Sequence, residues 1–151
     1  MSDTDLGFLS IAEASERIDK GDLSPVELVD ALIARAERLD PQLNAYLLPC
    51  FDEARVAARE AESAITSGGR VGPLHGIPFG LKDIIDTAGI RTTCHSKILE
   101  DHVPEKDAAV AARLTAAGGI MMGKLSTHEF AFGGPCFDLP WPPARNPWNT
   151  A

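Results

Sequence analysis

Lys82 is the residue of this 151-residue sequence whose surroundings most suggest chemistry. It follows the largely apolar run Ile77–Leu81 and precedes Ile84 and Ile85, so we expect it at the end of a buried strand. Buried lysines are rare unless they are paired or functional. Desolvation lowers the pKa of a lysine from its ordinary value of about 10.4, and a neutral amine can take a proton from a hydroxyl group. Lys82 is therefore a candidate general base.

The same residue has two other interpretations. In the first, its side chain extends to solvent and pairs with Asp83 or Asp86, as long amphipathic side chains often do. The residue pattern alone leaves this structural role and the catalytic role equally open. In the second, the amine attacks a carbonyl group directly and forms a Schiff base, which nothing else in the sequence favours.

Ser126 lies in a pattern that predicts a structural role. Ser126-Thr-His-Glu129 has the spacing of a capping box, so we expect Ser126 to cap a short helix over Phe130–Phe132 rather than to attack a substrate. The same stretch lacks the second histidine of a zinc-binding H-E-x-x-H motif, because Phe132 stands in its place. The sequence predicts no metal site, since the other histidines share no ligand spacing: His75, His95 and His102.

Composition and charge narrow the class of protein. The net charge is −8, from 22 acidic and 14 basic residues, and the basic residues are scattered, which argues against a nucleic-acid-binding face. No apolar run is long enough to span a membrane, and the first five residues are acidic where a signal peptide needs positive charge. An odd number of widely spaced cysteines predicts reduced thiols in the cytoplasm: Cys50, Cys94 and Cys136.

The first half of the chain is predicted to be helical. Capping boxes at Ser10–Glu13 and Ser24–Glu27 each open a helix. Gly21 is expected to close the first helix, and Pro41 to stop the second at about Leu39. A third helix is expected from Phe51 to Thr66. These helices are expected to form an amphipathic layer that serves packing rather than chemistry.

From Gly72 onward glycines and apolar residues replace the charged helical pattern. Short strands are expected at residues 43–48, 77–81 and 120–124, with a helix at 107–117 whose N-cap is Asp107. Residues from Gly133 onward are expected to be loop, because five prolines follow. Helix–strand alternation predicts an α/β fold with a mostly parallel mixed sheet that is incomplete in this chain.

Four segments together resemble the amidase-signature family, in particular the general amidases close to the A subunit of tRNA-dependent amidotransferases. The run Gly72–Gly89, which contains Lys82, is similar to the lysine motif of that family. Three later segments resemble family motifs in the same order: Asp107–Gly118, Met122–Gly133 and Asn146–Asn149.

The resemblance implies a Ser–cis-Ser–Lys triad that hydrolyses a small amide without a metal or organic cofactor. Lys82 matches the family lysine, which takes a proton from a serine in a cis peptide, and that serine activates the nucleophilic serine. By family position, the substrate cavity would be lined by Phe130, Ala131, Phe132 and Gly133, although ordinary core contacts explain these residues equally well. The matching serines are expected beyond Ala151, so the chain alone is predicted to be inactive.

The resemblance also implies a domain organisation. Residues 1–151 are expected to be the N-terminal part of one amidase domain, with a mainly helical part (1–70), an α/β part carrying the lysine motif (71–133) and a loop (134–151). Expected partners are an amide substrate in the full-length parent and either a second copy or a complementing C-terminal chain; no direct contact with nucleic acid or membrane is expected. The alternatives are half of a split amidase and a non-catalytic truncated paralogue that acts as a binding module.

Overall fold

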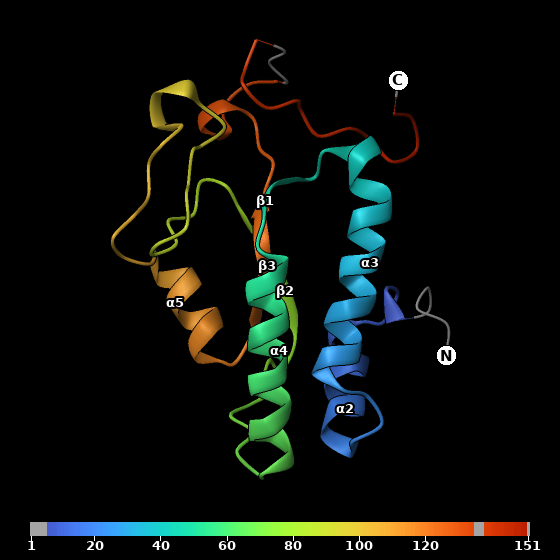
Figure 1. Ribbon diagram of the computed structural model, residues 1–151. Coiled ribbons are helices and arrows are strands. Elements are labelled where there is room, and N and C mark those ends of the chain that lie inside the picture. Colours follow the sequence, from blue (N-terminus) through green and yellow to red (C-terminus); the bar gives the residue numbers. More distant parts are fainter. Residues whose placement is uncertain (1–5, 135–137, 151) are drawn as a thin grey trace. The chain divides into compact units, whose positions relative to one another are not determined.

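The computed structural model describes residues 6–134 and 138–150, and it confirms the predicted α/β fold (Figure 1). Its elements, in chain order, are α2 (Ile11–Lys20), α3 (Pro25–Leu43), β1 (Tyr46–Pro49), α4 (Phe51–Thr66), β2 (Pro78–Lys82), the 3₁₀ helix η1 (Lys97–Leu99), α5 (Ala109–Ala116), β3 (Ile120–Leu125) and the 3₁₀ helix η2 (Glu129–Ala131). The chain divides into two compact units. Unit 1 contains residues 1–38, 50–79 and 113–122, and unit 2 contains residues 39–49, 80–112 and 123–151.

The three strands form one mixed sheet in the order β1-β3-β2. Strand β1 pairs with β3 in antiparallel fashion, with Pro49 opposite Gly123 and an irregularity between Tyr46 and Leu48. On the other side of β3, Ile120 donates its N–H to the carbonyl of Ile77, and the N–H of Asp83 donates to the carbonyl of Leu125. Residue numbers increase in the same direction along both strands between these two bonds, so β2 and β3 are parallel.

Unit 1 owes its stability to an apolar core between helices. Ser10 caps α2 through the predicted capping box, and Gly21 ends the helix in the left-handed conformation at φ 75°. The buried side chains that follow from the apolar spacing are Ala14, Ile18, Leu23, Leu28 and Ile77. Removing such side chains from water contributes roughly 25 cal/mol per Å² of apolar surface, so the burial of this cluster stabilises the unit.

The end of α3 differs from the prediction, because Pro41 does not stop the helix. The helix continues to Leu43, and Asn44, at φ 52°, ends it in the left-handed conformation. Proline removes one backbone donor at this position, but the Asp40 carboxylate accepts hydrogen bonds from the N–H groups of Ala45 and Tyr46 just beyond the helix. Local side-chain capping therefore offsets the cost of the proline.

One other local prediction is wrong. Asp107 does not serve as the N-cap of α5, which begins at Ala109; its carboxylate instead accepts a hydrogen bond from the N–H of Ala88 at 2.7 Å. Cys50 is buried and Cys94 is half-buried, whereas Cys136 lies outside the described residues. Within the described part of the chain, no helix combines the length and apolarity that crossing a membrane requires.

Replacing Gly123 with alanine should destabilise unit 2. The backbone at Gly123 has φ 148°, and an added Cβ would lie 2.5 Å from the carbonyl oxygen of Leu48 and 3.0 Å from Cα of Pro49. These are backbone atoms of the paired strand, so they cannot move aside without breaking the pairing. We expect the free energy of unfolding, measured by urea denaturation, to fall by about 3 kcal/mol or more.

The matched control is Gly89→Ala. Gly89 also has a positive φ, 72°, but an added Cβ would meet no atom within 4 Å. Only conformational strain of about 1–2 kcal/mol is expected there. Equal losses for the two variants would contradict the steric explanation for Gly123.

Candidate active site

Lys82 is the last residue of β2, and its predicted burial is wrong. Leu81 and Asp83 on either side are buried, with 3% and 0% of their surface exposed, whereas Lys82 is exposed. Side chains alternate between faces along a strand, so the two buried neighbours direct Lys82 to the opposite side. Within the described part of the chain, Lys82 forms no ion pair with Asp83 or Asp86.

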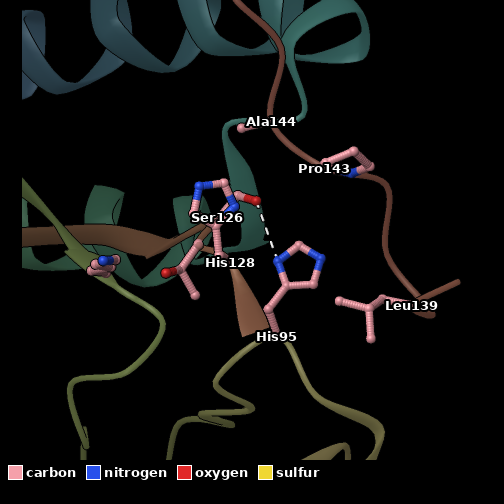
Figure 2. A pocket seen from close by; sticks show the side chains of 8 residues that line it. His95, Ser126, His128, Leu139, Pro143 and Ala144 are labelled. Carbon is pink, nitrogen blue, oxygen red and sulfur yellow. Dashed lines mark hydrogen bonds between the residues drawn. The ribbon is translucent and has the colours of Figure 1, made fainter. Parts of the chain in front are cut away.

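Lys82 lines a pocket of about 250 Å³ in unit 2. Figure 2 shows the side chains of its wall, which come from the ends of two strands and from two loops. None of the lining residues is acidic, and basic, hydroxyl-bearing and apolar groups alternate: Lys82, His95, Ser126, Thr127, His128, Leu139, Pro143 and Ala144. A concave site that combines apolar walls with a few polar groups is typical of a small-molecule site.

His95 forms the most constrained part of this wall, since only 1% of its surface is exposed. Its Nε2 lies 3.1 Å from the carbonyl oxygen of Trp141, and its ring packs edge-on against the Trp141 ring at 5.8 Å. A carbonyl oxygen accepts but cannot donate, so Nε2 carries a proton, and in the neutral ring Nδ1 is then an acceptor. Nδ1 lies 3.4 Å from Oγ of Ser126 (Figure 2).

The predicted capping role of Ser126 is wrong. The short helix η2 begins three residues later, its N-cap is His128, and no side chain caps it. Phe130, at φ 49°, departs from helical geometry, so the chain never forms the regular first turn that a capping box needs. Ser126 instead donates its backbone N–H to the carbonyl of Ala45 and directs its hydroxyl toward His95.

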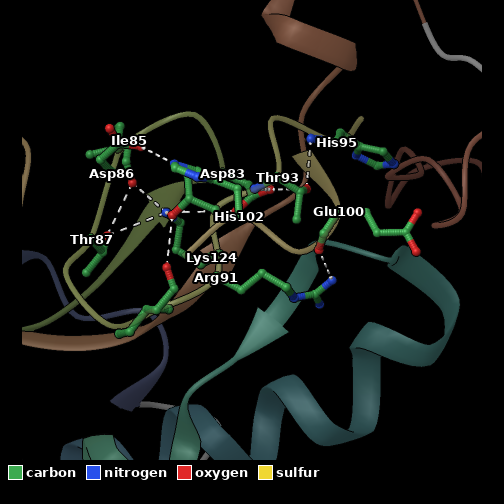
Figure 3. Close-up of polar contacts among 12 residues, drawn as sticks. Asp83, Ile85, Asp86, Thr87, Arg91, Thr93, His95, Glu100, His102 and Lys124 are labelled. Atoms are coloured by element: carbon green, nitrogen blue, oxygen red, sulfur yellow. Dashed lines mark hydrogen bonds and ion pairs between the residues drawn. The ribbon is translucent and has the colours of Figure 1, made fainter. Parts of the chain in front are cut away.

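The buried lysine of unit 2 is Lys124, which the sequence-based prediction did not single out. It is the penultimate residue of the largely apolar strand β3, Ile120–Leu125, and is 0% exposed. Its ammonium donates to the carbonyl of Ile85 and, at 2.6 Å, to Oγ1 of Thr92, and it lies 3.8 Å from Oδ1 of Asp83 (Figure 3). A lysine among apolar strand residues is the same signal that pointed to Lys82, so the sequence contained the information to find Lys124.

Asp83 is fixed from four directions next to Lys82. Its Oδ2 accepts hydrogen bonds from the N–H and the hydroxyl of Thr93, at 2.9 and 2.6 Å. Its backbone N–H donates to Leu125, and its carbonyl accepts from the N–H of Cys94 (Figure 3 shows the polar cluster). The peptide that follows Lys82 is therefore held rigidly, so the lysine side chain leaves the strand in one direction.

The predicted substrate-binding residues lie on an exposed segment. Phe130 and Phe132 are 48% and 88% exposed, and Phe130, Ala131 and Gly133 adopt positive φ values of 49°, 57° and 84°. The N–H of Phe130 donates to the carbonyl of Cys94, which anchors the start of the segment. None of the four residues lines the pocket that contains Lys82, so the structure does not bring these two sets together.

Cysteine and metal chemistry find no support in the described residues. Burial, assisted by the carboxylates of Asp83 and Asp86, raises the pKa of the Cys94 thiol, which keeps it protonated and weakly nucleophilic at neutral pH. No group of three histidine, cysteine, aspartate or glutamate residues in the described ranges 6–134 and 138–150 is placed to hold a metal ion.

Comparison with known proteins identifies the family. The sequence matches the family Amidase over residues 27–151. It is 45% identical over 141 residues to the A subunit of the glutamyl-tRNA(Gln) amidotransferase of Roseiflexus sp. (strain RS-1), and the match covers 93% of this chain and 29% of that protein. A bacterial aryl acylamidase of the amidase-signature family has a similar structure, with a TM-score of 0.85 and 29% identity over 95% of this chain and 30% of that one.

The peptide amidase from Stenotrophomonas maltophilia has the same fold, with a TM-score of 0.83 and 30% identity over 95% of this chain and 31% of that one. The chain thus spans about 30% of the length of the relatives that it matches. The family match covers most of the chain and includes Lys82 and all four segments of the resemblance. The chain belongs to the amidase family of amidase-signature enzymes.

Proposed function

We propose that this chain is the lysine-bearing N-terminal part of an amide hydrolase in which Lys82 is the general base of a Ser–cis-Ser–Lys triad. Family membership and the place of Lys82 within the matched residues support the assignment. The single structural observation that carries it is that Lys82 lines a pocket while the residue beside it is fixed by buried hydrogen bonds. A base needs both access to its substrate and a constrained direction.

The chemistry follows from the weakness of a hydroxyl as a nucleophile. Lys82 would take the proton of the bridging serine, and that serine would take the proton of the nucleophilic serine. The nucleophilic oxygen would then attack the amide carbonyl, form an acyl-enzyme and release ammonia or an amine. Water would complete hydrolysis by the same proton path, so no cofactor is needed.

The two serines would come from polypeptide outside these 151 residues, so the chain alone is proposed to be inert toward amides. They would belong to the same protein or to a complementing chain, and we treat residues 1–151 as the N-terminal part of one cytoplasmic amidase domain. Phe130, Ala131, Phe132 and Gly133 are proposed to meet the substrate when that polypeptide is present. Their high exposure leaves them free to do so. The substrate is proposed to be a small amide.

Sequencing the source DNA and transcript past the codon of Ala151 tests where the serines are. We expect the reading frame to continue into a Gly- and Ser-rich stretch with a further serine downstream. A stop codon there, with no neighbouring frame that encodes the two serines, would contradict the proposal. It would favour the non-catalytic binding module.

Replacing Lys82 with methionine should abolish amide hydrolysis in the protein that includes the following polypeptide. The change keeps the length of the side chain and removes the base, so kcat/KM for propanamide, benzamide or glutamine should fall by about 10²–10⁴-fold. Ammonia or amine release is the measurement. Lys106→Met is the matched control, because Lys106 is exposed and lies outside the pocket. Wild-type activity in Lys82→Met would exclude Lys82 as the base.

Asp83 and Lys124 should stabilise unit 2 as a coupled pair. Asp83→Asn or Lys124→Met alone leaves an uncompensated buried charge, so each should lower the free energy of unfolding by about 3–5 kcal/mol. The double variant should lose clearly less than the sum of the two, in a urea double-mutant cycle. The control pair is Asp30, which is exposed, and Arg55, which is half-buried; they lie 3.1 Å apart, and their coupling should stay below about 1 kcal/mol. Additive losses at Asp83 and Lys124 would show that the pair is not coupled.

A further inference from the structure

Ser126, His95 and the carbonyl of Trp141 form a hydrogen-bonded series on the wall of the pocket in unit 2. We propose that Ser126 is an acylation site of this chain, with His95 as its general base. The site would accept acyl groups from small activated esters. It is separate from the proposed triad, because it uses neither of the family serines nor Lys82 as the base.

The direction of the hydrogen bonds is what a nucleophile needs. The Trp141 carbonyl fixes the proton of His95 on Nε2, so Nδ1 offers its lone pair to the hydroxyl of Ser126. The hydroxyl therefore donates to His95, and its oxygen lone pairs are free to attack a carbonyl carbon. A nucleophile, a base within reach and a third group that orients the base are the three parts of such a site, and the third group can be neutral.

The base is held in place by its surroundings. The backbone N–H of His95 donates to Oγ1 of Thr93, and that hydroxyl donates to the buried carboxylate of Asp83. Cys94 and His95 both adopt the left-handed conformation, with φ values of 53° and 55°. This conformation costs about 1–2 kcal/mol per residue, and the surrounding hydrogen bonds maintain it. Backbone strain of this kind is concentrated at functional sites.

The nucleophile is accessible as well as oriented. Ser126 follows β3 directly, its N–H is bound to Ala45, and its side chain is only partly buried at the pocket. The 3.4 Å separation of Oγ and Nδ1 exceeds that of a tight hydrogen bond. Catalytic hydrogen bonds are often long without substrate and tighten when substrate binds, which a small rotation of the serine hydroxyl would accomplish here.

The reaction balances without a cofactor. Oγ of Ser126 attacks the ester carbonyl while Nδ1 of His95 takes the hydroxyl proton. The tetrahedral intermediate collapses, the bond to the leaving oxygen breaks, and the imidazolium returns the proton to that oxygen. Water then attacks the acyl-serine with His95 as base again, which releases the acid and restores the hydroxyl. A pocket of about 250 Å³ suits short acyl chains with a good leaving group.

The experiment treats the 151-residue chain with 4-nitrophenyl acetate and, separately, with an alkyl fluorophosphonate. The site of modification is mapped by mass spectrometry of the digested protein. We expect both reagents to modify Ser126. The nitrophenyl ester should also give a burst of nitrophenolate close to one per chain. A label on Lys82, on scattered surface lysines or on other serines in place of Ser126 would overturn the proposal.

Three variants complete the test, each checked for native circular dichroism. Ser126→Ala should remove the burst and the fluorophosphonate label, and His95→Gln should slow labelling of Ser126 by about 10²-fold or more. Ser63→Ala, at an exposed serine of α4, should react like the unmodified sequence. Equal labelling rates with and without His95 would also overturn the proposal. If a variant does not fold, the mass-spectrometric map of the labelled site on the chain without substitutions still tests the proposal.

Discussion

Unit 2 depends on the burial of one ion pair among hydroxyl groups. Lys124 and Asp83 are both 0% exposed, and the residues that surround them include Thr92 and Thr93, which are equally buried. Removing two charges from water is expensive, and it is tolerated only where hydrogen bonds satisfy the charged groups. The threonine hydroxyls, the carbonyl of Ile85 and the backbone N–H of Thr93 supply such bonds, whereas Oδ1 of Asp83 accepts no hydrogen bond from the described residues and has the Lys124 ammonium, 3.8 Å away, as its ionic partner. The stability of this polar core therefore depends on the geometry of its hydrogen bonds rather than on the apolar area that it buries.

The same buried polar core positions the residues of the candidate site. Asp83 follows Lys82 in the chain, so the hydrogen bonds that fix the Asp83 backbone also determine the direction in which the Lys82 side chain leaves the strand. Thr93 connects the same carboxylate to the backbone of His95, two residues further on. One buried carboxylate thus positions groups on both walls of the pocket, a lysine from β2 and a histidine from the following loop. Loops that carry functional groups need such a rigid scaffold.

Local signals in the sequence predicted local structure well. The capping box at Ser10 and the helix Phe51–Thr66 agree with the structure because backbone bonds within a few residues determine them. The prediction that Lys82 is buried was wrong, because apolar neighbours indicate a buried strand but not which face of it a given residue occupies. The predicted capping role of Ser126 was wrong for a related reason. The capping pattern competes with the tertiary contact to His95, 31 residues away in sequence.

Amide hydrolysis and acyl transfer from an ester make different demands on the rest of the protein. Amide hydrolysis needs a strong base and a stabilised leaving amine, so in the proposed triad it depends on the two family serines as well as on Lys82. Acyl transfer from an activated ester needs only an oriented hydroxyl and a neutral imidazole, because its leaving group departs without much help. The groups for the second reaction lie within one unit and are joined by hydrogen bonds. The proposed reaction with esters therefore does not depend on the proposed reaction with amides, since Ser126 and His95 are already oriented within unit 2.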